Sequence, residues 1–196
     1  MTSLDSLSQL ELFGEVCNQM EIAPENRKCA VRINPGVGAG HHEKVVTGGK
    51  KTKFGIAEYS IPQIFEIAEK YQITIAGINQ HIGSLFMDPQ PYLDAVTNLL
   101  RIAHQFKNLE FIDFGGGYGI PYHKLDDENP FPMEDFKSRL EPILDEFVTS
   151  YGKAPLFKSE PGRYCVAEGS VILGRVHATK ENSGIQFAGT DVGMNV

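Results

Sequence analysis

Gly115, Gly116 and Gly117 follow an apolar run and could do chemistry with their backbone alone. The N–H groups of consecutive glycines can converge into a concave nest that binds a phosphate group. A tight turn at the end of a strand is the alternative. Because Tyr118 and Gly119 come next, and the pattern GxGxxG before a helix is missing, the sequence gives little support for a Rossmann dinucleotide site.

Glu160 and Arg163 belong to a second segment, EPGR. A carboxylate directly after the apolar run APLFKS could be partly buried, where it would attract a cation such as a protonated ring nitrogen. The guanidinium of Arg163 can bind a phosphate or a carboxylate through two parallel hydrogen bonds. A structural ion pair, between these two side chains or with a neighbour, is the alternative, and a nearby phosphate nest weakens it.

His81 and Ser84 form a third segment, HIGS. An imidazole at the mouth of a sheet could stack on a flat ligand or exchange protons, although a partly buried histidine with hydrogen-bond partners is the commoner arrangement. The Ser84 hydroxyl suits a phosphate oxygen, but serine is also an ordinary turn residue. Both interpretations stay open for this segment.

A metal site has little support. His41, His42 and Glu43 are adjacent, but neighbouring side chains point in different directions and no third ligand stands at a familiar spacing. The basic stretch GGKKTK at 48–53 could attract an anionic substrate, and solvated loop is its simpler explanation.

Helices and strands alternate around these segments. Strands alternating with helices of ten or more residues favour parallel pairing through right-handed crossovers, as in a doubly wound sheet or a barrel. The three segments follow the carboxyl ends of predicted strands, where both architectures place their sites. Hydrophobic periodicity predicts helices over 5–20, 61–71, 88–106 and 131–151, strands over 29–37, 73–83, 109–117 and 154–162, and a last strand within 185–196.

Length and charge limit the class of protein. The chain has 196 residues, enough for one hydrophobic core, whereas a complete eight-stranded α/β barrel needs about 250. A net charge of -7 without clustered basic residues argues against nucleic acid as a partner. No membrane span or signal peptide is evident, so we expect a cytoplasmic protein. Cys17, Cys29 and Cys165 form no CxxC pair, and we expect reduced, buried thiols.

Five ordered motifs resemble diaminopimelate decarboxylases and cover nearly the whole chain. HIGS, the triple glycine and EPGR are shared by the wider family of fold-type III pyridoxal-phosphate decarboxylases for ornithine, arginine or diaminopimelate. The long glycine-rich loop favours the diaminopimelate branch. The motifs are RINPGVGAGHHEKVVTGGKKTKFGI at 32–56, HIGS at 81–84, DFGGGYGIPY at 113–122, EPGRYCVAEGSVILGRV at 160–176 and DVGMN at 191–195.

The resemblance implies an α/β fold. Residues 1–175 would form a partial (β/α)8 TIM-like barrel of the alanine-racemase-like type, with pyridoxal 5'-phosphate bound at its mouth. Residues 176–196 would begin a C-terminal β domain. Because the chain begins at the helix over 5–20, we expect the first barrel strands and most of the β domain to be missing. The resemblance also implies a homodimer.

Roles carry over by position. His81 would stack on the pyridine ring, and Glu160 would pair with the ring nitrogen, so that both take part in catalysis. Arg163 would contact the phosphate or a substrate carboxylate, and Arg32 would lie behind the ring. The phosphate would be bound by Ser84, Gly115, Gly116, Gly117 and the turn at Pro161 and Gly162.

The implied reaction converts meso-2,6-diaminopimelate to L-lysine and CO2, the last step of lysine biosynthesis. Loss of CO2 leaves a carbanion, whose charge the protonated ring accepts, and an anionic Glu160 would keep the ring nitrogen protonated. The alternatives are a sister decarboxylase for arginine, ornithine or carboxynorspermidine, and a non-catalytic protein that binds pyridoxal phosphate or a partner.

Three departures from the family bear on activity. The lysine that forms the Schiff base normally lies on the first barrel strand, so we expect it to be missing and the chain alone to be inactive. The C-terminal domain, which supplies a cysteine-containing segment and a tyrosine to the partner subunit's site, is also expected to be missing. Asn79 stands where diaminopimelate enzymes commonly have a histidine.

Overall fold

The computed structural model describes residues 1–36, 52–122 and 129–193. The chain divides into two compact units, Met1–Cys165 and Val166–Val196. The boundary predicted between residues 175 and 176 rests on the family resemblance and stays a prediction. The histidine pair of the glycine-rich loop and most of the basic stretch lie outside the described residues.

The first unit is built on a sheet of five parallel strands hydrogen-bonded in sequence order. Each connection advances by one strand in the same direction, so right-handed crossovers place the intervening helices on one face of the sheet. This is the winding of a barrel, because a doubly wound sheet reverses its strand order. The strands are β1 (Thr2–Leu4), β2 (Lys28–Arg32), β3 (Thr74–Asn79), β4 (Phe111–Asp113) and β5 (Leu156–Lys158).

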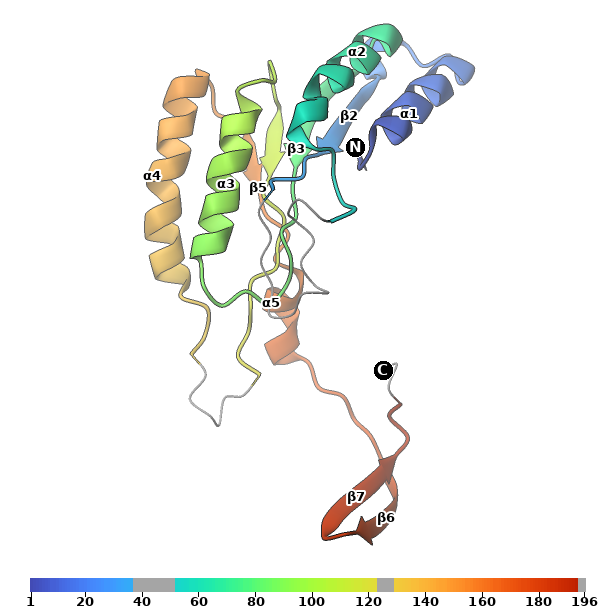
Figure 1. The fold of residues 1–196 in the computed structure, drawn as a ribbon, viewed down its shortest axis with the longest axis vertical. Helices are drawn as coiled ribbons and strands as arrows, with labels where there is room; N and C mark the ends of the chain where they lie inside the picture. Colours follow the sequence, from blue (N-terminus) through green and yellow to red (C-terminus); the bar gives the residue numbers. More distant parts are fainter. Residues whose placement is uncertain (37–51, 123–128, 194–196) are drawn as a thin grey trace. The chain divides into compact units, whose positions relative to one another are not determined.

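Four helices lie in order along this sheet (Figure 1). The first begins at Ser6, whose hydroxyl accepts a hydrogen bond from the Gln9 N–H at 3.3 Å, and the last ends at Gly152 with a φ of 81°. The helices are α1 (Leu7–Gln19), α2 (Ile61–Tyr71), α3 (Gln90–Ala103) and α4 (Met133–Tyr151), with 3-10 turns at Pro24–Asn26 and Glu58–Ser60.

The hydrophobic core lies between the sheet and the helices. In-register residues on this face are fully or almost fully buried, among them Val31, Ile78 and Ile112. Helices α1 and α2 approach so closely that a Cβ atom on Gly14 would overlap the Tyr71 ring. Because the helix-facing side of each strand is apolar, its opposite side is free to carry polar groups.

A polar row lies on the other face of the sheet, at the carboxyl ends of the strands. Arg32, Asn79, Asp113 and Lys158 are in register on β2, β3, β4 and β5, so their side chains emerge on the same side. The Asn79 amide oxygen accepts a hydrogen bond from the Ser3 hydroxyl at 2.6 Å. The strand ends therefore present a charged surface that the buried core does not use.

The second unit contains an antiparallel hairpin of β6 (Val176–Asn182) and β7 (Ile185–Thr190). Ser183 and Gly184 form its turn, both with positive φ, which is the conformation of a type I′ turn. Before the hairpin the chain forms α5 (Gly162–Val166), which begins in the first unit, and a 3-10 turn at Ala167–Gly169.

The four predicted helices are confirmed, and α2 has the predicted bounds. Two predictions about local structure are wrong. A helix does not open the chain, because β1 precedes α1 and pairs with β2. Cys165 is exposed, whereas Cys17 and Cys29 are buried as expected. Cys165 lies on α5, which has no buried residue.

Candidate functional site

Backbone hydrogen bonds continue past the ends of β3, β4 and β5. The Gln80 N–H donates to the Asp113 carbonyl at 3.0 Å, and the Glu160 N–H donates to the Gly115 carbonyl at 2.9 Å. This ladder brings the segments that begin at His81, Gly115 and Glu160 side by side. The three segments singled out in the sequence therefore meet at one edge of the sheet.

Crowding explains the three consecutive glycines. A Cβ atom on Gly116 would overlap the Glu160 carbonyl, and one on Gly117 would overlap the Gly83 carbonyl. Gly115 and Gly117 also have φ values of +73° and +109°, which L side chains rarely adopt. The glycine segment is therefore required by the close approach of the two neighbouring strand ends.

Two of the glycine N–H groups already have acceptors. The Gly115 N–H donates to Asp113 Oδ1 at 2.9 Å, and the Gly116 N–H donates to His81 Nδ1 at 3.3 Å. In the described part of the chain the Gly117 N–H has no acceptor. This N–H is the group that the glycine segment can offer directly to an anion, and phosphate binding here stays a prediction.

His81 is half-buried beside the glycines, and its environment favours the neutral imidazole. Burial lowers its pKa first, and the positive charge of Arg32 lowers it further. Asp113 and the carbonyl of Gly83 act in the opposite direction. A neutral ring is consistent with the Nδ1 atom accepting the Gly116 N–H.

Glu160 is a carboxylate in a site that disfavours a second negative charge. Partial burial raises its pKa, and Asp113 raises it further, while Arg32 opposes them. Among the described residues Glu160 forms no ion pair with Arg163, whose guanidinium instead donates to the Tyr122 hydroxyl at 3.1 Å. The structural ion pair weighed from the sequence is therefore not formed here, and both charges remain available to a ligand.

Arg32 is held between several groups at the end of β2. Its guanidinium lies 3.5 Å from the Asp5 carboxylate, donates to the His81 carbonyl at 3.5 Å and covers the Phe54 ring at 4.9 Å. The side chain is 20% exposed. It adds positive charge near His81 and Glu160.

The remaining predicted residues surround this centre. Ser84 is half-buried and three residues from His81, and it makes no side-chain hydrogen bond within the described part of the chain. Pro161 is half-buried, and Gly162 is exposed at the start of α5, with open space where a Cβ would be. Their phosphate-binding roles stay predictions.

The sequence did not indicate the residues beneath the glycines. The buried Tyr92 and Tyr118 and the exposed Ser159 form a cluster of hydroxyls around the Gly115 carbonyl. Gln80 is fully buried, and both atoms of its side-chain amide lack a hydrogen-bond partner among the described residues. Such unpaired groups are costly, and their presence marks this strand edge as unusual.

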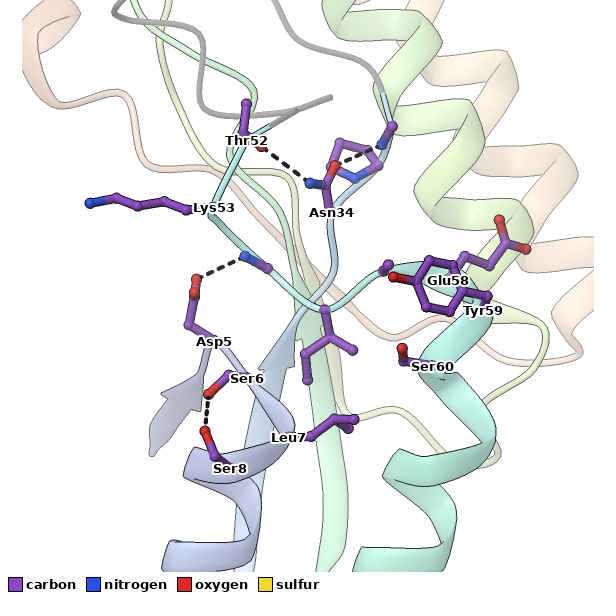
Figure 2. Close-up of a pocket in the computed structure, with 15 residues that line it drawn as sticks. Asp5, Ser6, Leu7, Ser8, Asn34, Thr52, Lys53, Glu58, Tyr59 and Ser60 are labelled. Carbon is purple, nitrogen blue, oxygen red and sulfur yellow. Dashed lines mark hydrogen bonds between the residues drawn. The ribbon is translucent and has the colours of Figure 1, made fainter. Parts of the chain in front are cut away.

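A pocket of about 840 Å³ opens beside the site, at the ends of β1 and β2 and the first turns of α1 and α2 (Figure 2). Asp5 links the pocket to the site, because its carboxylate approaches Arg32 and accepts the Gly55 N–H at 3.1 Å. None of the predicted site residues lines this pocket. The strand-end cluster, and not this pocket, is therefore the candidate site.

A family model described as "Pyridoxal-dependent decarboxylase, pyridoxal binding domain" matches residues 1–167. The chain belongs to this decarboxylase family. The match includes the segments at His81, the triple glycine and Glu160, which the structure brings together at one edge of the sheet. The family shown by the comparison is the one that the motifs indicated.

Two similar proteins are diaminopimelate decarboxylases. The enzyme of Methanothermobacter thermautotrophicus is 41% identical over 199 residues, which cover 98% of this chain and 44% of the relative. That of Haemophilus influenzae is 32% identical, with 98% and 45% covered. The chain thus spans less than half the length of these relatives.

Solved structures agree on the fold. Diaminopimelate decarboxylase from Helicobacter pylori, complexed with L-lysine, has a TM-score of 0.83 at 28% identity, covering 98% of this chain and 47% of that chain. The enzyme from Methanocaldococcus jannaschii has a TM-score of 0.81 at 30% identity, covering 98% and 44%. The five-stranded parallel sheet and its helices therefore form part of the α/β barrel of this family.

Neither a metal cluster nor a membrane-spanning helix is present in the described ranges. No group of three or more His, Cys, Asp and Glu side chains is arranged there to hold a metal ion. No described helix is both long and apolar enough to cross a bilayer. The paired histidines at 41 and 42 fall outside these ranges.

The crowding at Gly116 predicts a stability difference between two glycine substitutions. Gly116→Ala forces the Glu160 backbone to move and should lower the free energy of unfolding by about 1–3 kcal/mol. Gly162→Ala places its methyl group in open space, in a helix, and should change the free energy of unfolding by less than about 1 kcal/mol. Urea unfolding of both variants measures the contrast, and equal losses would contradict the close approach.

The lowered pKa of His81 predicts a pH dependence of stability. Below its ordinary pKa of about 6.5 the unfolded chain takes up a proton that the folded chain resists, so the free energy of unfolding falls as the pH drops through this range. His81→Asn keeps an acceptor near the Nδ1 position and removes the proton. Urea unfolding at several pH values between 5 and 7.5 gives the free energy of unfolding at each pH. This free energy should depend less steeply on pH in the variant, and an unchanged pH dependence would contradict the lowered pKa of His81.

Proposed function

We propose that this chain binds pyridoxal 5'-phosphate at the carboxyl ends of β3, β4 and β5. The observation that carries the proposal is the meeting of His81, the crowded glycines and Glu160 within the part of the chain that matches a pyridoxal-binding domain. A cofactor with an anionic phosphate and a cationic ring nitrogen fits this edge. The site offers N–H and guanidinium donors together with the carboxylates of Asp113 and Glu160.

The charges support the orientation of the cofactor. When both are ionised, the carboxylates of Glu160 and Asp113 repel each other, and the attraction of Glu160 to Arg32 offsets this repulsion only partly. A protonated ring nitrogen would relieve this repulsion, so Glu160 is its natural partner. His81 would then lie against the ring face, with Arg32 behind the ring. When bound, the cofactor supplies an electron-accepting ring that stabilises the carbanion formed on loss of CO2.

The phosphate would lie near the glycines and the start of α5. The Gly117 N–H, the Ser84 hydroxyl and the turn at Pro161 and Gly162 would donate to it or shape its surroundings. Arg163, whose guanidinium is exposed and donates to the Tyr122 hydroxyl, could turn to the phosphate or to a substrate carboxylate.

We propose that the reaction is decarboxylation of meso-2,6-diaminopimelate to L-lysine and CO2. The named relatives at 41% and 32% identity support this substrate. Support for a sister substrate such as ornithine is limited to the fold, because the lysine/ornithine decarboxylase of Vibrio vulnificus is 21% identical to this chain. A homodimer, expected from the family, belongs to the same proposal, as does an address in the cytoplasm.

Cofactor affinity tests the proposed site. Arg163→Met and Glu160→Gln should each weaken binding of pyridoxal phosphate by about 10-fold or more, the value of one charge-assisted hydrogen bond. Absorbance or calorimetric titration of the full 196-residue chain gives the dissociation constants. Arg139→Met is the matched control, since this arginine pairs with Asp135 on α4. Equal affinities in all three variants and the parent chain would refute the site.

Turnover is proposed separately from binding. The sequence assigns no lysine to the position where the family bonds its cofactor, so we expect the 196-residue chain to bind pyridoxal phosphate and to release no CO2 from meso-diaminopimelate. Mass spectrometry after borohydride reduction should find no cofactor bonded to a lysine. Release of CO2 with formation of L-lysine would overturn this proposal, and a panel with ornithine, arginine and carboxynorspermidine would identify the substrate.

A further inference from the structure

Tyr92, Tyr118 and Ser159 form a hydroxyl cluster beneath the glycine segment. We propose that this cluster positions His81, acting through the peptide that joins Gly115 to Gly116. The inference rests on the proposed cofactor site, where His81 is the residue against the ring. It assigns roles to residues that contact neither the ring nor the phosphate.

A continuous path of hydrogen bonds connects the cluster to the imidazole. The Tyr92 hydroxyl donates to the Gly115 carbonyl at 3.2 Å, and the Ser159 hydroxyl donates to the same oxygen at 3.1 Å. At the other side of this peptide, the Gly116 N–H donates to His81 Nδ1 at 3.3 Å. Donors to the carbonyl polarise the peptide and strengthen its N–H as a donor.

Tyr118 links the other two hydroxyls of the cluster. It donates to the Tyr92 hydroxyl at 2.9 Å, and it lies 2.9 Å from the Ser159 hydroxyl, where either oxygen can be the donor. Tyr92 therefore directs its own proton to the Gly115 carbonyl, and Ser159 donates to the same oxygen at 3.1 Å.

Burial keeps the tyrosine hydroxyls protonated and in place. Tyr92 and Tyr118 are 1% and 7% exposed, and burial is the main cause that raises the pKa of each. Their rings pack against Phe86 at 5.2 and 5.5 Å and against Phe136 at 5.4 and 5.7 Å. The two tyrosine hydroxyls are thus held in place by the packing of their rings, whereas Ser159 is exposed.

The Gly115 carbonyl accepts more hydrogen bonds than are needed to keep it paired in the folded chain. It also accepts the Glu160 N–H at 2.9 Å, which gives three donors for two lone pairs. Loss of one hydroxyl leaves the carbonyl paired, so it should cost little in folding. Excess donors on one oxygen are better explained by control of the orientation and polarity of this peptide.

The consequence for His81 is a defined tautomer. Because Nδ1 accepts the Gly116 N–H, the ring proton lies on Nε2. The Gly83 carbonyl competes by favouring a protonated ring. Arg32 from β2, Asp113 from β4 and Glu160 after β5 are the charged groups around the ring. The cluster therefore tips the balance toward a neutral ring held against the glycines.

Nitrogen NMR of the full chain without cofactor tests the inference. The two ring nitrogens of His81, identified by their loss in His81→Asn, should show Nδ1 unprotonated and Nε2 protonated. Tyr92→Phe and Ser159→Ala should each shift the Nδ1 resonance toward a tautomeric mixture, and the double variant should shift it most. Tyr118 is one hydrogen bond further from the Gly115 carbonyl, so Tyr118→Phe should shift the Nδ1 resonance less. It should leave the melting temperature unchanged.

Tyr151→Phe is the matched control. Its hydroxyl donates to the Phe106 carbonyl at 2.9 Å and accepts the Leu109 N–H at 3.1 Å, remote from the glycines. A parent chain with Nδ1 protonated would overturn the inference, as would equal shifts in the double variant and in Tyr151→Phe. Should the double variant fail to fold, the single variants decide.

Cofactor titration separates this inference from the proposed function. If pyridoxal phosphate binds, the double variant should weaken it by about 3- to 10-fold, while Tyr151→Phe leaves it unchanged. Failure of the parent chain to bind would refute the proposed function, and the NMR result without cofactor would still decide the role of the cluster.

Discussion

The close approach of the β4 and β5 ends at Gly116 and Glu160 is the constraint on which the site depends. No side chain fits at Gly116, because the Glu160 carbonyl occupies that space. This contact sets the separation between Glu160 and the glycines. It also aims the Gly116 N–H at His81, so the imidazole, the glycines and the carboxylate are fixed by one backbone contact.

The two faces of the sheet carry different kinds of residue. Apolar residues in register, such as Val31, Ile78 and Ile112, pack under the helices and hold the strands together. The opposite face carries Arg32 and Asp113, which set the charge around His81 and Glu160. Stability thus comes from one side of the sheet, and the other side can hold charges that repel one another.

The sequence predicted what local rules determine. Helical periodicity located the four helices α1 to α4, and glycines and charged residues at strand ends indicated segments that the structure brings together at one edge of the sheet. The predicted strands are longer than the observed ones. Each predicted range also includes polar and glycine residues that follow the strand but do not pair in the sheet. The three residues of β1 were too few for any pattern, and Gly162 suggested a turn where α5 begins. Tyr92 on α3 and Tyr118 after β4 are 26 residues apart and meet only in the folded chain, which no spacing reveals.

The sequential strand order has a consequence for how this chain folds. Each strand pairs with the one before it, so every new βα unit closes a loop of only one helix and its connections. Contacts therefore form between neighbours in sequence, which lowers the entropy cost of closing each loop compared with a sheet that reverses its order. During synthesis β1, β2 and β3 can dock in that order as they emerge, and β4 and β5 complete the glycine segment after them.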